Sequence, residues 1–308
     1  MLACGLAYAQ AYPAKPIRVV VPYPPGGGTD IVMRAIGPKV SERLGQPVIV
    51  DNRGGATGAI GAEMVAHAAP DGYTLLAHTS AGLTIVPNLQ KKLAFDPVRD
   101  FAPVTLATSS PYMLVVNPKL PAASVAELIA LAKKRPGELN YASSGNGSAT
   151  HLAGLLFCRM AGVSMVHIPY KGSGPAVADL VAGQVLMRFS SIPPSLPHVR
   201  SGRLRALAVT GIKRFSLLPD IPAIAETLPG YDVVSWYAVL APAGTPAAIV
   251  RKLNAEIVAA LHASDVKALL EADGSEPVGT TPERLGEVLR ADIARWGPIV
   301  RETGARID

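Results

Sequence analysis

Short apolar runs alternate along the chain with longer stretches in which apolar residues recur every three or four positions. The runs IRVVV (17–21), PVIV (47–50) and YTLLA (73–77) have the length and β-branched content of buried strands. The stretches between them, 29–45 and 57–72, have helical spacing and end in glycine. Strands that alternate with helices are typical of βαβ units, so this pattern predicts an α/β protein with a parallel sheet.

The same alternation starts again at YMLVV (112–116). We expect the following elements after it: a helix at 124–137 with Ser124 as N-cap, a strand at 139–143, a helix at 148–162, a strand at 164–168, a helix at 175–183, and strands at 186–190 and 204–210. Two series of this kind predict two halves, each with its own parallel sheet.

Two amphipathic helices are predicted near the C-terminus, at 245–262 and 281–300. Each starts with Thr-Pro, which suits an N-cap followed by the first helical residue. Their apolar residues fall on one face of each helix: Ile249, Leu253, Ile257 and Leu261 in the first, and Leu285, Leu289, Ile293, Trp296 and Val300 in the second. We expect these faces to pack on a sheet, and we assign no chemistry to the solvated ones.

Composition narrows the classes of protein that fit. A chain of 308 residues with 49% hydrophobic and 17% charged residues is long enough for two domains, and neither disorder nor a multi-span membrane protein fits it. The net charge of +6 is spread along the chain and only 5% of residues are aromatic, so no nucleic-acid partner is expected. A mildly basic surface favours a small anion instead.

The N-terminal residues 1–9 are apolar and end in Ala7-Tyr8-Ala9, which matches the cleavage site of a secretory signal peptide. We interpret them as a signal remnant, with a mature chain from about Gln10 in the periplasm; an ordinary apolar N-terminus is the alternative. Cys4 lies in this remnant, and its lipobox signal is weak. Cys158 is then the one remaining cysteine, and we expect it to be a buried, inert thiol.

The loop after the first strand, VVVPYPPGGGTD, resembles half of a dinucleotide-binding site. A strand, glycines and a helix precede Asp51 at the end of the next strand, as in the Rossmann layout. The glycine pattern at 26–31 lacks its third glycine, Pro24 and Pro25 remove N–H donors, and Asp30 adds negative charge where a pyrophosphate would bind. These departures argue against a nucleotide.

Main-chain N–H groups at Gly27, Gly28 and Thr29 nevertheless stand at the start of a predicted helix. Glycine lets a ligand approach the backbone, and a helix N-terminus favours negative charge. A small carboxylate therefore suits the loop better than a phosphate does. A plain turn, with Thr29 or Asp30 as N-cap, is the alternative.

Three further loops follow predicted strands and are rich in donors. They are SSGNGSATH (143–151), HTSAG (78–82) and PYKGSGPA (169–176), the last with Lys171 as a charge partner. Ligands of α/β proteins bind at the carboxyl ends of strands. Four such loops divided between two halves predict a cleft between them.

The sequence contains none of the common catalytic or metal-binding motifs. The chain has no G-x-S-x-G, H-E-x-x-H or C-x-x-C motif, and its histidines are scattered. Ser148 and His151 lie three residues apart at the start of one predicted helix. This spacing favours a helix-capping serine next to a histidine, and argues against a nucleophile paired with its general base. Lys171 in a glycine loop favours an exposed charge over a Schiff-base lysine. We therefore expect a protein that is not an enzyme and that holds no metal or cofactor.

Six segments together resemble a known family in order and spacing. They are 12–36, with PYPPGGGTD; 48–76; 140–157, with SSGNGSATH; 167–185, with PYKGSG; 196–210; and 236–257, with LAPAGTP. The chain is identified on them as similar to the Bug or TctC-like extracytoplasmic solute receptors of tripartite tricarboxylate transporters.

The resemblance implies a periplasmic-binding-protein fold of type II, a Venus flytrap whose two α/β domains close on a small carboxylated solute. Domain 1 would comprise 10–115 and 226–308, and domain 2 would comprise 116–225. The implied partners are the permease subunits of a tripartite transporter in the membrane, or a sensor protein, with the receptor itself a monomer.

The resemblance also implies the ligand-binding residues. One wall of the cleft would contain Tyr23, Gly27, Gly28, Thr29, Asp30, Thr79 and Ser80. The other would contain Ser143, Ser144, Gly147, Ser148, Ala149, Thr150, His151, Lys171, Gly172 and Ser190, and would hold a ligand carboxylate at a helix N-terminus.

The chain departs from the family pattern V-D-V-M-F-D-S-L-P at 185–193, which here reads VLMRFSSIP and has lost both acids. A receptor for amino acids needs an acceptor for the ammonium group, and Ser190 replaces a carboxylate there. We therefore expect a ligand without an amino group: a mono-, di- or tricarboxylate or an aromatic acid. Arg188 alternates with Phe189, so we expect it to be a surface charge turned away from the cleft. An enzyme that acts through Ser148 and His151, or on a nucleotide, is the rival interpretation.

Overall fold

The computed structural model describes residues 12–90, 93–272 and 274–303. The strands are β1 (Ile17–Val21), β2 (Val48–Asn52), β3 (Thr74–Thr79), β4 (Phe101–Val116), β5 (Asn140–Ser143), β6 (Val166–Pro169), β7 (Met187–Ser191), β8 (Arg205–Val209), β9 (Val234–Pro242) and β10 (Glu276–Pro277). The α-helices are α1 (Gly28–Leu44), α2 (Ala59–Ala66), α3 (Ser80–Thr84), α4 (Val86–Leu89), α5 (Val125–Lys134), α6 (Ala149–Ala161), α7 (Ser173–Ala182), α8 (Ile192–Arg200), α9 (Ala247–Leu261), α10 (Ser264–Ala272) and α11 (Pro282–Thr303), and short 3-10 turns occupy Ala56–Gly58 and Ile224–Glu226. The predicted signal remnant 1–9, with Cys4, lies outside the described residues.

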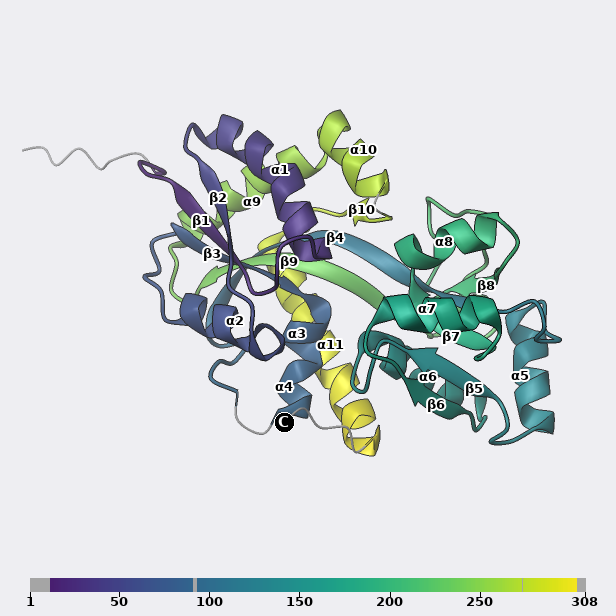
Figure 1. The fold of residues 1–308 in the computed structure, drawn as a ribbon. Helices are drawn as coiled ribbons and strands as arrows, with labels where there is room; N and C mark the ends of the chain where they lie inside the picture. The colour runs from purple at the N-terminus through teal and green to yellow at the C-terminus, as the bar shows by residue number, and fades with distance from the viewer. Residues whose placement is uncertain (1–11, 91–92, 273, 304–308) are drawn as a thin grey trace, which may run out of the picture.

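The strands form two sheets that share β4, as Figure 1 shows. In the first, β2, β1 and β3 are parallel, and β9 runs antiparallel to both β3 and β4. In the second, β5, β6 and β7 are parallel, and β7 and β8 run antiparallel to β4. The prediction of purely parallel sheets was therefore wrong. The βαβ units exist, but β4 and β9 run antiparallel beside them.

Strand β4 is the physical link between the halves. Residues 101–111 pair with β9, and residues 112–116 pair with β7 and β8. We call the part built on β1–β3, β9, β10 and residues 101–111 the first lobe, and the part built on β5–β8 and residues 112–116 the second. The sequence predicted only 112–116 as a strand, because Pro103 and Pro111 disfavour a central strand. The structure places Pro103 at a break in the β4–β9 register and Pro111 where the strand changes sheets.

The first lobe has helices on both faces of its sheet. Alternate residues of β1 point to opposite faces, so Val19 packs with Met33 of α1 and Leu253 of α9, whereas Val20 packs with Val65 of α2 and Leu285 of α11. Both faces of β1 are buried, as the continuous apolar run IRVVV predicted. The start of α1, which follows β1, and Thr79 at the end of β3 face the second lobe.

The second lobe repeats this arrangement. Leu114 of β4 shares a buried cluster with Leu128 of α5 and Phe157 of α6, while Met113 shares another with Leu180 of α7 and Ile192 of α8.

The two late helices pack through the predicted faces, but α11 has contacts in both lobes. Leu285 and Leu289 lie in a first-lobe cluster, and Trp296 and Val300 lie in the cluster that holds Phe157 of the second. Figure 1 shows α11 running from one lobe toward the other. The residue boundaries of the two domains stay a prediction.

Of the N-caps predicted at Ser124, Thr245 and Thr281, the first and the last are present; the Thr281 hydroxyl accepts from the Arg284 N–H at 3.3 Å, at the start of α11. The Ser124 hydroxyl accepts a hydrogen bond from the Glu127 N–H at 3.2 Å, as a cap does. Thr245 was predicted to cap α9, but the helix begins one residue later, with Pro246 as N-cap. The Thr245 hydroxyl instead donates to the Pro242 carbonyl at 2.8 Å. Within the described residues, no helix combines the length and the apolar character that crossing a membrane requires.

Candidate functional site

A cleft of about 480 Å³ lies between the two lobes. Its walls come from the start of α1, from α3 and from the crossing strands β4 and β9 on one side, and from the starts of α6, α7 and α8 on the other. The lining residues are Gly28, Ile31, Thr79, Ala81, Ser110, Pro111, Tyr112, Ser144, Ser148, Ala149, Thr150, Ser173, Ser191, Pro193, Ser235, Tyr237 and Ser275.

The lining is rich in hydroxyl groups but carries no ionised side chain: none of these residues is Asp, Glu, Lys, Arg or His. Hydroxyl groups of serine, threonine and tyrosine supply most of its polar atoms. Helices α1, α6, α7 and α8 begin at the cleft, and the N-caps of α1 and α7, Gly27 and Gly172, provide no side-chain cap. Helix N-termini carry partial positive charge, so the cleft favours an anion.

Ser148 and Thr150 shape the second-lobe wall. The Ser148 hydroxyl caps α6 by accepting from the His151 N–H at 3.2 Å, and it donates to the Gly145 carbonyl at 2.8 Å. Thr150 accepts from the Ser144 N–H at 3.0 Å. These bonds confirm the capping interpretation of Ser148, and they fix the loop whose main chain borders the cleft.

His151 lies behind this loop and does not meet Ser148 as a general base would. Its Nδ1 accepts from the Gly147 N–H at 3.1 Å, and its ring stacks on that of His167, with centroids 3.7 Å apart. Burial and the neighbouring His167 lower the pKa of His151 to about 4. The imidazole is therefore neutral at pH 7, and it serves as an acceptor for the main chain.

Arg188 is the residue that the sequence placed wrongly. It was expected on the surface, but its side chain is fully buried. The guanidinium donates to the hydroxyls of Ser144 and Ser173 at 3.0 and 2.9 Å and to the Ser173 carbonyl at 2.8 Å. Burial lowers its pKa to about 10, which leaves it charged at pH 7. Alternation along β7 does turn Arg188 to the face opposite Phe189, but that face is covered by the Ser144 loop and the start of α7, which line the cleft.

On the first-lobe wall, the Tyr23 hydroxyl links the loop after β1 to the end of β3. It lies 2.8 Å from Thr79 Oγ1 and 3.2 Å from His78 Nδ1. Thr79 also accepts from the Gly82 N–H, as the N-cap of α3. Burial raises the pKa of the Tyr23 phenol, which therefore stays neutral.

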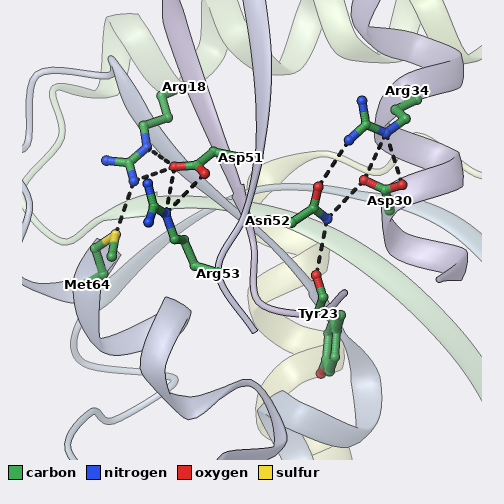
Figure 2. A network of polar contacts seen from close by, with 8 residues as sticks. All are labelled: Arg18, Tyr23, Asp30, Arg34, Asp51, Asn52, Arg53 and Met64. Carbon is green, nitrogen blue, oxygen red and sulfur yellow. Dashed lines mark hydrogen bonds and ion pairs between the residues drawn. The ribbon is translucent and has the colours of Figure 1, made fainter. Parts of the chain in front are cut away.

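Asp30 is buried and faces its own loop. Figure 2 shows its carboxylate accepting from Arg34 and from the side-chain amide of Asn52. It also accepts from the Gly26 N–H at 2.9 Å, and the Asn52 amide donates in turn to the Tyr23 carbonyl at 3.1 Å. Burial alone would raise the pKa of Asp30, but the Arg34, Gly26 and Asn52 hydrogen bonds bring it below its ordinary value. This network holds the PYPPGGGTD loop in shape.

Asp51, the residue that a dinucleotide site would use for ribose, is engaged elsewhere. Figure 2 shows it between Arg18 and Arg53, with Arg18 also near the Met64 sulfur. Burial would raise the pKa of Asp51, and the two arginines lower it. No group of three or more His, Cys, Asp or Glu side chains in the described part of the chain is placed to hold a metal ion.

The predicted site residues divide into two groups. Those that line the cleft are Gly28, Thr79, Ser144, Ser148, Ala149 and Thr150. Those that lie behind or outside its lining are Tyr23, Gly27, Thr29, Asp30, Ser80, Ser143, Gly147, His151, Lys171, Gly172 and Ser190. Lys171 is exposed, and Ser190 is buried with its hydroxyl 2.7 Å from that of Ser195.

Five of the eleven lining residues that were not predicted come from β4 and β9, the two strands that run between the lobes. Ser110, Pro111 and Tyr112 lie on β4, and Ser235 and Tyr237 lie on β9. The passage of β4 and β9 between the two lobes was not predicted, so no sequence pattern indicated that these residues would line a cleft. Ser173 could have been found, because it belongs to the donor-rich loop PYKGSGPA that was selected for Lys171.

The two lobes and the cleft between them define a solute-binding protein of the two-lobed α/β class. The family model "Tripartite tricarboxylate transporter family receptor" (TctC) matches residues 32–305. The chain belongs to this family, and the resemblance inferred from the six segments is confirmed.

Individual relatives agree with this assignment. Protein BugT of Bordetella pertussis is 42% identical over 301 residues, which cover 97% of this chain and 92% of BugT. A Rhodopseudomonas palustris protein solved with adipate is 39% identical, with a TM-score of 0.78 and coverage of 96% of this chain and 100% of that one. MatC from the same organism, solved with malate, is 36% identical, with a TM-score of 0.74 and coverage of 94% and 100%.

Proposed function

We propose that the cleft captures a small carboxylated solute that lacks an amino group, in the periplasm. A di- or tricarboxylate fits it best, and a monocarboxylate or an aromatic acid belongs to the same class. The receptor would release the solute to the membrane subunits of a tripartite transporter or report it to a sensor protein.

The observation that carries this proposal is the chemistry of the lining. Hydroxyl donors and four helix N-termini surround a space that no ionised side chain enters. A carboxylate gains hydrogen bonds and a favourable potential there. An ammonium group would find no carboxylate to accept its protons, and burying it unpaired is costly. Ser190, at the position where the family pattern has an acid, is turned to Ser195 and leaves the cleft without one.

The relatives support the same class of ligand. The solved structures with adipate and with malate both hold dicarboxylates without an amino group. A further solved relative, BugD, is a periplasmic binding protein with 32% identity and a TM-score of 0.75.

Binding without turnover is the part of the proposal that separates a receptor from an enzyme. The Ser148 hydroxyl is used in capping, and the His151 ring accepts from the main chain, so neither is arranged to attack a bound acid. The lobes would close on the ligand and open to release the same molecule.

A ligand panel on the chain from Gln10 tests the proposal. Succinate, malate, adipate, citrate and benzoate are compared with aspartate, glutamate and NAD by thermal shift, followed by calorimetry on every hit. We expect at least one plain carboxylate to bind, and a ligand at 100 times its Kd to add about 2.7 kcal/mol of stability.

NMR of the recovered ligand should find it chemically unchanged. A response to NAD or to amino acids alone, or conversion of the bound acid, would contradict the proposal.

A further inference from the structure

Arg188 is a buried cation that donates hydrogen bonds to two residues of the cleft lining. It lies in β7, is 0% exposed, and contacts the cleft only through Ser144 and Ser173, which both line it. Its remaining bonds go to the carbonyls of Ser173 and Phe189.

No carboxylate forms an ion pair with Arg188 in the part of the chain that the structure describes. Asp179 of α7 accepts instead from the Tyr170 hydroxyl at 2.8 Å. Every partner of the guanidinium is a neutral oxygen. A buried charge without a counter-ion is unfavourable, so the free protein keeps a positive charge that an anion could complement.

The hydrogen-bond directions around Arg188 fix what the two serines can offer. Each hydroxyl oxygen already accepts a hydrogen bond from the guanidinium, and the Ser144 oxygen also accepts one from the Thr150 hydroxyl at 3.4 Å. The two serine oxygens lie 3.1 Å apart, and only one of their protons can be used in the bond between them. The other proton is left over for the cleft. The pair therefore presents a donor to a ligand, and its acceptor positions are occupied.

We propose that Arg188 is a positioning residue that selects an anionic group at the second-lobe wall. It holds the Ser144–Ser173 pair so that one of the two hydroxyls donates into the cleft, and a ligand carboxylate bound to that hydroxyl complements the Arg188 charge through the pair. The inference rests on the proposed function, since it assigns one carboxylate of the solute to a place in the same cleft. A neutral amide gains less there, and an ammonium group meets a like charge.

The test compares Arg188→Met with the wild type, using the tightest-binding diacid of the panel and its uncharged diamide as probes. Methionine keeps most of the side-chain length and removes the charge. Loss of a charge-assisted contact should weaken diacid binding about 10- to 100-fold. Diamide binding should change less than about 3-fold. Arg188→Lys keeps a charge without the two-pronged geometry, so it should restore part of the loss.

A second measurement separates this role from a structural one. Arg188→Met removes an uncompensated charge but leaves the Ser173 and Phe189 carbonyls without their donor, so the readout is the ligand-induced stabilisation measured against the variant's own ligand-free midpoint, which should fall. A merely structural arginine would give a different result: a lower midpoint in the free protein with diacid affinity retained. Arg205→Met is the control, because it removes an exposed arginine from the same lobe and should leave Kd unchanged.

Ser144→Ala and Ser173→Ala decide the matter should Arg188→Met fail to fold. Each removes one hydroxyl of the pair that presents the donor and should weaken diacid binding about 10- to 100-fold, as expected for one hydrogen bond to a charged group. Full affinity in both variants would overturn the inference.

The two proposals fail in different ways. If wild-type protein binds no carboxylate, the proposed function is wrong. If it binds a diacid that Arg188→Met binds equally well, only the role of Arg188 is wrong.

Discussion

Among the residues that the structure describes, each lobe buries one ionised side chain beside the cleft, and these two side chains differ in their hydrogen-bond partners. Asp30 of the first lobe accepts from Arg34, a main-chain N–H and the Asn52 amide. Arg188 of the second lobe has neutral partners throughout. The first wall therefore balances its own charge, whereas the second keeps a net positive one.

This difference indicates that the two walls of the cleft contribute differently to ligand binding. A ligand anion should bind the second lobe first, where helix N-termini and the Arg188 charge act in the same direction. The first lobe, with a neutral Tyr23 and a compensated Asp30, would then close on it through shape and uncharged groups.

Asp30→Asn should have the largest effect on stability. An amide cannot accept from Arg34, Gly26 and Asn52 together, and it turns a donor toward them. We expect the free energy of unfolding to fall by about 2–3 kcal/mol, measured by urea denaturation. Asp220→Asn, which changes an exposed carboxylate by the same chemistry, should stay within about 0.5 kcal/mol of the wild type.

The same variant also tests the comparison itself. If Asp30 serves only its own loop, the Kd of folded Asp30→Asn for the panel's tightest diacid should change less than about 3-fold, set against the larger loss in Arg188→Met. A large loss of affinity without a loss of stability would show that the first wall contributes charge after all.

His78 provides a pH dependence of known sign. It is 1% exposed, its Nδ1 accepts from the Thr79 N–H, and burial lowers its pKa from 6.5 to about 4. The unfolded chain therefore binds a proton between pH 6.5 and 4 that the folded protein does not. Stability is fully present above pH 6.5 and falls as the pH drops through this window.

Between pH 7.5 and pH 5 the loss from His78 alone should be about 2 kcal/mol. Urea denaturation at several pH values measures it. His78→Asn, which keeps an acceptor near the Nδ1 position but does not titrate, should show a flatter pH profile whatever its absolute stability. An unchanged profile would mean that other groups, such as His151, dominate the acid response.

Much of the fold could be predicted from local patterns. Strand β1 was predicted at its observed bounds, and α1 within one residue at each end, because buried strands and amphipathic helices leave a period in the sequence. The first part of β4 and all of β9 were missed. Both strands contain proline, which disfavours a strand prediction. They pair with each other through residues more than a hundred positions apart in the sequence. Such long-range pairing has no local signature.

The site followed the same rule. Ser148 and Thr79 were found because both lie in donor-rich loops that directly follow predicted strands, which is a local feature of the sequence. Tyr237 and Ser110 were not, because only the crossing of β4 and β9 brings them to the cleft. Arg188 was misplaced for a related reason: its burial depends on Ser144 and Ser173, which belong to two other loops.

Gly28→Ala tests whether the first lobe contributes shape. Gly28 is the first residue of α1 and lines the cleft, and a Cβ there would stand 2.1 Å from the Tyr237 hydroxyl oxygen. Since the backbone φ is not positive, alanine fits the helix and the clash falls on the tyrosine side chain. Tyr237 must move within the cleft, and we expect calorimetry to find diacid binding weakened about tenfold, or 1.4 kcal/mol.

Gly286→Ala, the matched control, should have the smallest effect of all. It lies in α11, and a Cβ there meets its nearest neighbour, Arg290, at an ordinary 3.5 Å. Alanine should raise the free energy of unfolding by up to about 1 kcal/mol through helix propensity, with Kd unchanged. Equal losses of affinity in both variants would mean that helix rigidity matters and not the space beside Tyr237. A loss in Gly28→Ala alone would assign the first lobe a steric role opposite the charged second one.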